Sequence, residues 1–144
     1  SLDIQDFSPF KALNDLPMGM TAHLVYTEID ETPATLSKTV MDIIRMDIGF
    51  DGLIMTDDIS MKALSGDLGT LSRASIEAGC DVILHCNGTL SERTQVAQAA
   101  GEMTDIAQKR AIRAVDMRKP PDMIDIAALD AELEALLGGG AFAQ

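Results

Sequence analysis

A glycine-bounded apolar run in the middle of the sequence, followed by two adjacent aspartates, restricts the possible folds more than any other stretch. The run is Leu53–Met55 within residues 49–61, and Asp57 and Asp58 come shortly after it. A short apolar run is typical of a strand buried on both faces, which is the pattern of parallel sheets. Because ligands collect at the carboxyl edge of such sheets, we expect Asp57, Asp58 or both to carry the function.

Similar patterns along the chain extend this prediction to an α/β fold. We expect parallel strands near residues 18–23, 52–57 and 81–86. Helices are expected over about 37–46, 60–64 and 70–78, with a helical tail over about 91–137. Strands and helices that alternate at this spacing form right-handed βαβ units. Three strands are few for a sheet of this kind, and a closed eight-stranded barrel takes about 250 residues. If the fold is a barrel, this chain forms its last part.

The charge of the chain excludes one class of function. The net charge is −12, which argues against a protein that binds nucleic acid through phosphate contacts. Five of the eleven basic residues nevertheless lie in one short segment, and they are Lys109, Arg110, Arg113, Arg118 and Lys119. Charge runs are common on exposed helices, so this segment is predicted to be a solvated helix face.

Cysteine spacing and hydropathy predict a reduced, cytoplasmic protein. Cys80 and Cys86 flank the third predicted strand on the same face, about 20 Å apart at the rise of a strand, which is too far for a disulfide. No apolar run reaches the length of a membrane span, and the first residues are polar and acidic, unlike a signal peptide. We therefore expect no membrane contact and a cytoplasmic location.

Several stretches of the sequence, taken in order, carry a resemblance to a known family. They are residues 6–10 (Asp-Phe-Ser-Pro-Phe), 20–23 (Met-Thr-Ala-His), 30–37, 49–61 and 78–84. As a set they resemble the family 3 glycoside hydrolases, specifically the bacterial β-N-acetylglucosaminidases (β-hexosaminidases) of peptidoglycan recycling. The resemblance is dense over residues 6–88. It implies that the three strands are the last of a (β/α)8 TIM barrel, and that residues 1–144 form the C-terminal part of that barrel domain, followed by C-terminal helices.

By this resemblance, Asp57 is the catalytic nucleophile, because it is the first Asp after the Thr in the family's Gly-Phe-Asp-Gly…(Ser/Thr)-Asp motif. The residues alone do not separate Asp57 from Asp58. A retaining glycosidase needs a carboxylate beneath the anomeric carbon and an acid above the leaving oxygen. The carboxylate forms a glycosyl-enzyme that water then hydrolyses. The implied activity removes terminal β-linked N-acetylglucosamine (N-acetylhexosamine) from peptidoglycan fragments, with no metal or organic cofactor.

Two functional parts of the family have no counterpart in this sequence. They are the acid/base His, which is paired with an Asp, and the sugar-binding stretch Lys-His-Phe-Pro-Gly-His-Gly. His23 and His85 lie in other contexts, so the acid/base role is not transferred to them. We therefore expect an N-terminal part of the barrel as a partner, in the same polypeptide or as a separate chain, and a muropeptide carbohydrate as ligand. The full-length protein is expected to be the enzyme, and these 144 residues alone are expected to be inactive.

Each candidate residue also has a structural interpretation. Asp57 can cap a helix, since Asp commonly follows a strand in that position. Asp58 is interpreted as a structural carboxylate that caps the next helix or orients its neighbours. His23 lies at a strand end, where a substrate or supporting contact and a satisfied core histidine are both open. The family usually has an apolar residue at the position of His85, which favours a structural role there.

Two other classes of function stay open. The side chains of Asp57, Asp58, His23 and His85 could converge as a carboxylate and imidazole metal site. Their spacing does not require it, because no two of them lie on a helix at ligand spacing. A non-catalytic half-barrel that serves as an interaction module is the other alternative, with an open strand edge near His23 for a partner.

Overall fold

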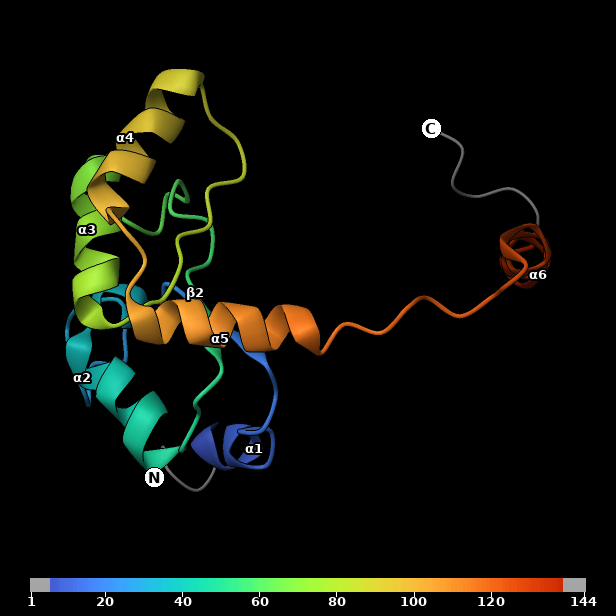
Figure 1. The fold of residues 1–144 in the computed structure, drawn as a ribbon, viewed down its shortest axis with the longest axis horizontal. Helices are drawn as coiled ribbons and strands as arrows, with labels where there is room; N and C mark the ends of the chain where they lie inside the picture. Colours follow the sequence, from blue (N-terminus) through green and yellow to red (C-terminus); the bar gives the residue numbers. More distant parts are fainter. Residues whose placement is uncertain (1–5, 139–144) are drawn as a thin grey trace.

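The computed structural model describes residues 6–138, and its centre is a short parallel sheet (Figure 1). Strand β1 is Met18–Met20 and strand β2 is Leu53–Met55. They pair in parallel, with Met18 opposite Leu53 and Met20 opposite Met55. The first two predicted strands are therefore present, in the predicted orientation, but each is shorter than expected.

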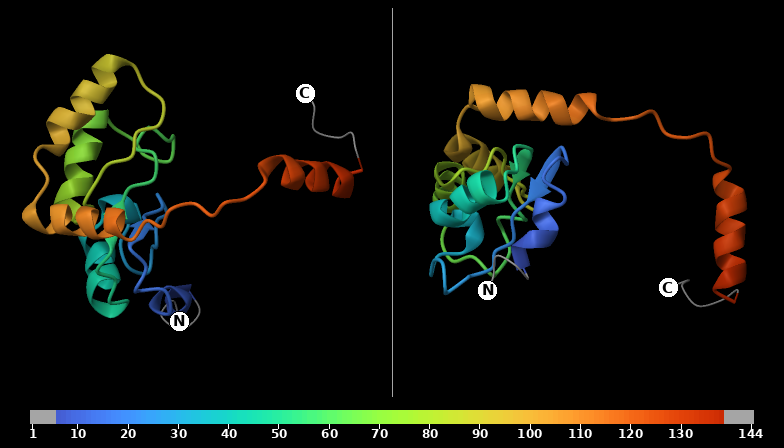
Figure 2. Two further views of the ribbon diagram at one scale, coloured as in Figure 1. Left: turned by 45° about the vertical axis from the view of Figure 1, so that its right-hand side comes forward. Right: turned by 90° about the horizontal axis from the view of Figure 1, so that it is seen from below.

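Helices make up most of the remaining regular structure. In chain order they are α1 (Ser8–Lys11), the 3-10 helix η2 (Ala34–Leu36), α2 (Lys38–Asp42), the π-helix η3 (Ile43–Asp47), α3 (Leu68–Ala78), α4 (Leu90–Ala100), α5 (Asp105–Asp116) and α6 (Ile126–Leu136). Figures 1 and 2 show α3 and α4 side by side, α5 across one face of the body, and α6 well apart from it. Within residues 6–138 no helix is long and apolar enough to cross a membrane.

The third predicted strand, 81–86, is wrong as a regular strand, because only Val82 forms a bridge, parallel to Met55. The segment still follows β2, and Val82 receives a hydrogen bond from the Thr56 amide at 3.2 Å. Two residues further on, the amide of Leu84 donates to the hydroxyl oxygen of Thr56 at 2.9 Å instead of to a backbone carbonyl. The side chain of Thr56 thus replaces the next link of the ladder, and the strand pattern ends there.

The helix predicted over 60–64 is also wrong, and turns occupy this segment. The Asp58 carboxylate accepts from the Ser60 amide at 3.1 Å, which closes a side-chain turn where a helix would begin. The helix expected to start at Ser37 is present, and the Ser37 hydroxyl caps it by accepting from the Val40 amide at 3.1 Å. It runs as α2 and then as the wider η3.

Two apolar clusters hold the helices against β2. The first packs between β2, α2 and the end of α3, and its buried members are Met41, Ile48, Phe50, Ile54, Ala78 and Cys80. The second lies beneath α3 and α4, and its buried members are Ile59, Leu64, Leu71 and Val96. Because Ile59 directly follows the Asp57–Asp58 pair, the second cluster anchors the chain immediately after the two aspartates.

The basic segment is not simply a solvated helix face, as the sequence predicted. Arg110 of α5 forms ion pairs with Asp51 at 2.8 Å and with Asp81 at 3.0 Å. Arg113 pairs with Asp51 at 3.2 Å, and Arg45 of η3 pairs with Asp81 at 2.8 Å. These contacts fasten α5 to the amino end of β2. The prediction holds for Lys109, Arg118 and Lys119, which are exposed, and failed for Arg110 and Arg113 because their acidic partners lie far away in the sequence.

The glycine of the motif that precedes β2 is required by close backbone packing. A Cβ on Gly52 would meet the ring of Phe50 and would lie 2.7 Å and 2.9 Å from the carbonyl oxygens of Leu16 and Pro17. Carbonyl oxygens of the backbone cannot rotate away as a flexible side chain can. Gly52 therefore allows the segment before β1 to approach the start of β2.

We expect Gly52→Ala to lower the free energy of unfolding by about 1–3 kcal/mol, as overpacking does. Urea denaturation followed by circular dichroism measures the change. Gly69→Ala is the matched control. Gly69 lies within α3, and its Cβ would lie 3.2 Å from side-chain atoms of Asp67 and of Gln95. Alanine favours a helix over glycine, so this control should lose little stability or gain some. Equal losses for the two variants would contradict the packing argument.

Candidate active site

Asp57 lies at the carboxyl end of β2, as predicted, and is half-buried. Its Oδ1 atom accepts a hydrogen bond from the backbone amide of Asp58 at 2.7 Å. Among residues 6–138, no donor bonds its Oδ2 atom. One oxygen is therefore fixed by the backbone, and the other remains available to a ligand. Asp57 does not act as a helix cap, because turns follow it.

Thr56 is a site residue that the sequence reasoning did not assign a role. Its side chain is completely buried, and its hydroxyl accepts from the amide of Leu84 at 2.9 Å. It thereby joins the segment 81–86 to β2 directly before Asp57. The signal was present in the Thr-Asp pair of the motif, since a hydroxyl next to a functional carboxylate at a strand end suggests a backbone contact.

Asp58 is a supporting carboxylate, with contacts both to the turn that follows it and to segment 81–86. Its Oδ1 atom accepts from the Ser60 hydroxyl at 2.8 Å, the Ser60 amide at 3.1 Å and the Cys86 amide at 3.3 Å. Burial raises the pKa of the Asp58 carboxyl, whereas these hydrogen bonds and the charge of His85 lower it. The lowering effects together are larger, so the pKa lies below its usual value. The carboxylate is therefore ionised at neutral pH and connects the turn after β2 to segment 81–86.

His23 is buried beneath the same turn and supports it. Its Nε2 atom lies 3.0 Å from the carbonyl oxygen of Asp58, and its Nδ1 atom lies 2.8 Å from the hydroxyl of Thr35. Because a carbonyl only accepts, Nε2 must carry the proton. In a neutral ring Nδ1 then accepts from Thr35. The Thr35 hydroxyl also lies 2.8 Å from that of Thr21, which extends the chain of hydrogen bonds from β1 to Asp58.

His23→Leu should lower the free energy of unfolding by about 1–3 kcal/mol, because it leaves the buried carbonyl of Asp58 without its donor. His23→Gln is the control, since its amide can still donate from the position of Nε2, and it should lose less. Urea midpoints of the two variants check this. A larger loss for the Gln variant would show that the hydrogen bond to Asp58 does not matter.

His85 lies at the far end of segment 81–86, beside the turn after β2. Its side chain is 6% exposed, and its Nδ1 atom is 3.7 Å from Oδ1 of Asp58. Both ring nitrogens are buried without a hydrogen-bond partner among the described residues. The structure therefore brings both predicted histidines to Asp58, one beneath its carbonyl and one beside its carboxylate.

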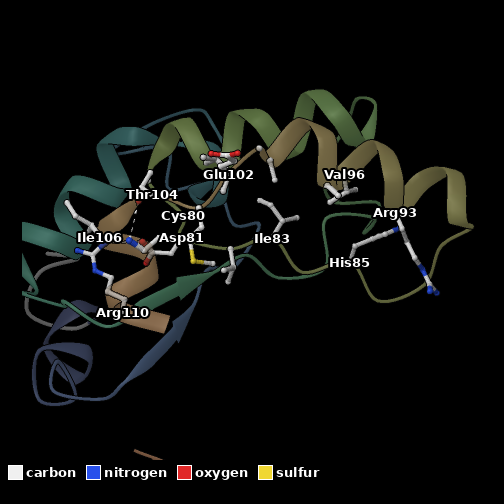
Figure 3. Close-up of a pocket in the computed structure, with 18 residues that line it drawn as sticks. Cys80, Asp81, Ile83, His85, Arg93, Val96, Glu102, Thr104, Ile106 and Arg110 are labelled. Carbon is white, nitrogen blue, oxygen red and sulfur yellow. Dashed lines mark hydrogen bonds and ion pairs between the residues drawn. The ribbon is translucent and has the colours of Figure 1, made fainter. Parts of the chain in front are cut away.

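A cleft of about 570 Å³ lies between segment 79–85 and the helices α4 and α5, and Asp57 is not among its lining residues. His85 and Arg93 lie at one end of it, and Asp81 and Arg110 at the other (Figure 3). Cys80 also lines the cleft, and burial raises the pKa of its thiol to about 12, which excludes a thiolate nucleophile at neutral pH. Cys80 and Cys86 are both free thiols. A second, apolar pocket of about 330 Å³ lies beside β1.

The metal-site alternative finds no support in the geometry. Within residues 6–138, no group of three His, Cys, Asp or Glu side chains could hold a metal ion. The contact of His23 with Asp58 involves the backbone carbonyl, so that imidazole is already used in holding the turn.

Comparisons with known proteins point to one family. Residues 1–117 match the family model described as the glycosyl hydrolase family 3 N-terminal domain. The chain is 42% identical over 88 residues to a β-hexosaminidase of Actinobacillus succinogenes, covering 59% of the chain and 25% of that relative. It is 36% identical over 114 residues to a β-hexosaminidase of Hydrogenovibrio crunogenus, covering 76% of the chain and 32% of that relative.

A solved structure shows the same similarity in three dimensions. It is a glycoside hydrolase family 3 β-N-acetylglucosaminidase from Paenibacillus sp. strain FPU-7, with a TM-score of 0.66 at 25% identity. The match covers 87% of this chain and 28% of that one. The chain thus spans about a quarter to a third of the length of these proteins. Since the matching model is the N-terminal domain of its family, the assignment of this chain to the closing part of a barrel stays a prediction.

Proposed function

The chain belongs to glycosyl hydrolase family 3, and on that premise we propose that it supplies the nucleophile of a retaining β-N-acetylhexosaminidase. The β-hexosaminidases and the β-N-acetylglucosaminidase that it resembles support hydrolysis of a terminal N-acetylglucosamine. In this proposal Asp57 is the nucleophile, and Asp58 and His23 hold the turn that presents it.

The half-buried carboxylate of Asp57 is the observation that carries the proposal. A nucleophile must approach the anomeric carbon in a fixed orientation, and misplacement by about 1 Å is costly. The hydrogen bond from the Asp58 amide at 2.7 Å fixes Oδ1, and within the described residues Oδ2 has no competing donor. This oxygen can therefore attack without first breaking a protein contact.

The reaction follows as a double displacement. Oδ2 of Asp57 forms a bond to the anomeric carbon while the bond to the leaving oxygen breaks, and a general acid protonates that oxygen. Water, deprotonated by the same group, then attacks the anomeric carbon and releases Asp57 as a carboxylate. The product keeps the β configuration because each step inverts it. We propose that the acid/base group comes from outside these 144 residues.

The two flanks of the sheet support a partner for this chain. The apolar pocket lies beside β1, where Met18 and Met20 are exposed, and the larger cleft lies beside segment 81–86. Open strand edges pair readily with further strands. We propose that the remaining strands of a (β/α)8 barrel pair at these two edges, in the same polypeptide or as a separate chain.

The substrate that we propose is a peptidoglycan fragment with a terminal β-linked N-acetylglucosamine, acted on in the cytoplasm. The family resemblance of the motifs supports this choice. Release of N-acetylglucosamine from purified muropeptides tests the substrate, and cell fractionation with an antibody tests the location.

The decisive experiment is hydrolysis of p-nitrophenyl N-acetyl-β-glucosaminide by the full-length natural protein that contains these residues. The p-nitrophenyl β-glucoside is the matched substrate that lacks the acetamido group. We expect hydrolysis of the first only, with a β-configured sugar as the first product by proton NMR. The 144-residue chain alone should hydrolyse neither.

Three results would contradict the proposal. An α-configured first product would exclude a glycosyl-enzyme on Asp57. Full turnover by the isolated chain would show that the acid/base lies within it. No hydrolysis of either substrate by the full-length protein would leave an interaction module as the better interpretation.

A further inference from the structure

His85 is a buried imidazole to which the proposed function assigns no role. Its side chain is 6% exposed, and neither ring nitrogen has a hydrogen-bond partner within residues 6–138. Buried polar side-chain atoms are nearly always paired, so an exception needs an explanation. A leucine or isoleucine would fill this position without the cost of a buried, unpaired ring.

The ring is placed against one acceptor in particular. Nδ1 lies 3.7 Å from Oδ1 of Asp58, a carboxylate that is itself only 18% exposed. A shift of less than about 1 Å would bring the two atoms to hydrogen-bond distance. On the opposite side of the ring, a Cβ on Gly88 would collide with Nε2, so the turn after segment 81–86 fits closely around the imidazole. The ring can therefore move toward Asp58 but not toward residue 88.

The charged groups around the ring favour a donor to Asp58. The carboxylates that act on His85 are Asp58, in the turn after β2, and Glu92, in α4. Arg93 of α4 lines the same end of the cleft (Figure 3). The thiol of Cys86 is adjacent in the chain. Hydrogen bonds from the Thr89 amide and hydroxyl, with a smaller effect of the His85 charge, lower the pKa of Glu92. Both carboxylates are thus ionised at neutral pH and can only accept hydrogen bonds, so the ring meets Asp58 favourably when Nδ1 carries a proton.

Asp58 connects His85 to the nucleophile. The amide of Asp58 donates to Oδ1 of Asp57 at 2.7 Å, and its carbonyl lies 3.0 Å from Nε2 of His23. His23 thus fixes the backbone of Asp58. Ser60 and Cys86 bind its carboxylate by hydrogen bonds, and His85 lies next to that carboxylate. Any displacement of Asp58 moves the donor that orients Asp57.

We propose that His85 is a positioning residue, whose Nδ1–H group donates to the Asp58 carboxylate and so keeps Asp57 in its attacking orientation. This inference rests on the proposed function. His85 touches no reacting atom in this scheme and acts through Asp58.

The test compares His85→Leu with His85→Asn in the full-length protein. Asn can place an amide donor near the position of Nδ1 without titrating, and Leu places none. For His85→Leu we expect kcat to fall about tenfold with little change in KM, because substrate contacts remain. His85→Asn should recover most of kcat. An unchanged kcat in His85→Leu would overturn the inference, and so would failure of His85→Asn to recover what His85→Leu loses.

A second measurement separates this inference from the proposed function, because it needs no activity. Urea midpoints of the unsubstituted protein, His85→Leu, Asp58→Asn and the double variant form a double-mutant cycle. If the two side chains interact, the double variant loses less than the sum of the single losses. Strict additivity would overturn the inference. If the stability losses are not additive but the full-length protein hydrolyses no glycoside, the contact between His85 and Asp58 stands and only the proposed function is refuted.

Discussion

Asp57→Asn should lower kcat on p-nitrophenyl N-acetyl-β-glucosaminide by about 10³- to 10⁵-fold, the range for losing the group that forms a covalent intermediate or activates it. The amide oxygen of Asn can still accept from the Asp58 amide, so the turn should keep its shape. What disappears is the negative charge and the nucleophilic oxygen. A steady-state assay of the full-length protein measures the loss, with circular dichroism to confirm folding.

Asp58→Asn is the matched control for this prediction. Its remaining oxygen can accept from the Ser60 and Cys86 amides, as Asp58 does. We expect a fall in kcat of no more than about tenfold, which is about 1.4 kcal/mol of transition-state stabilisation. If Asp58→Asn lost as much activity as Asp57→Asn, the assignment of the nucleophile to Asp57 would be unsupported.

Chemical rescue provides a sharper criterion. Asp57→Gly leaves space for azide, which can attack the anomeric carbon from the side that Asp57 occupies. A single displacement inverts the configuration, so the product should be an α-glycosyl azide when the substrate has a good leaving group. Asp58→Gly should give no such product. Absence of the azide adduct from Asp57→Gly, in a folded protein, would count against a covalent role.

Asp81→Asn should lower the free energy of unfolding by about 3–5 kcal/mol, the cost of removing one partner from a buried charge network. The Asp81 side chain is 6% exposed and bonds Arg45 at 2.8 Å and Arg110 at 3.0 Å. It also accepts from the amide of Ile54 in β2 at 2.8 Å. The substitution keeps the volume but leaves the largely buried guanidinium of Arg45 without its counter-charge, and leaves Arg110 paired only with the exposed carboxylate of Asp51. Urea denaturation measures the change.

Asp51→Asn is the control within the same network. Asp51 pairs with Arg110 and Arg113, but its side chain is 69% exposed, so water replaces the lost pairs. We expect a loss of about 0–1 kcal/mol, as for surface ion pairs. Similar losses in the two variants would mean that burial of Asp81 does not control the energetics.

The course of the chain around the candidate site follows largely from local patterns. The apolar run that became β2 could be predicted because its length and composition fit a buried strand. Capping by Ser37 and the helix after it could be predicted because a hydroxyl precedes an apolar period of about 3.6 residues. The position of Asp57 at a strand end required only knowledge of where β2 stops.

The contacts that distinguish one residue from another could not be predicted in this way. The Thr-Asp pair suggests a backbone contact for the Thr56 hydroxyl, but it does not identify the partner as Leu84, whose amide bonds this hydroxyl in place of a backbone acceptor and so ends the third strand early. The helix predicted after the aspartates is absent because the Asp58 carboxylate accepts the hydrogen bond of the Ser60 amide. Both failures arise from side-chain competition for backbone hydrogen bonds, which periodicity does not reveal.

The sequence by itself determined that parallel strands and helices alternate here and that two adjacent carboxylates follow the central strand. It did so because strand burial and helix capping depend on neighbouring residues. Only the tertiary structure decided the separate roles around those carboxylates. The contacts of Asp58 with His23 and His85 join positions 35 and 27 residues apart in the sequence. Such contacts form only once β1, β2 and segment 81–86 lie side by side, so the orientation of Asp57 is a property of the folded chain.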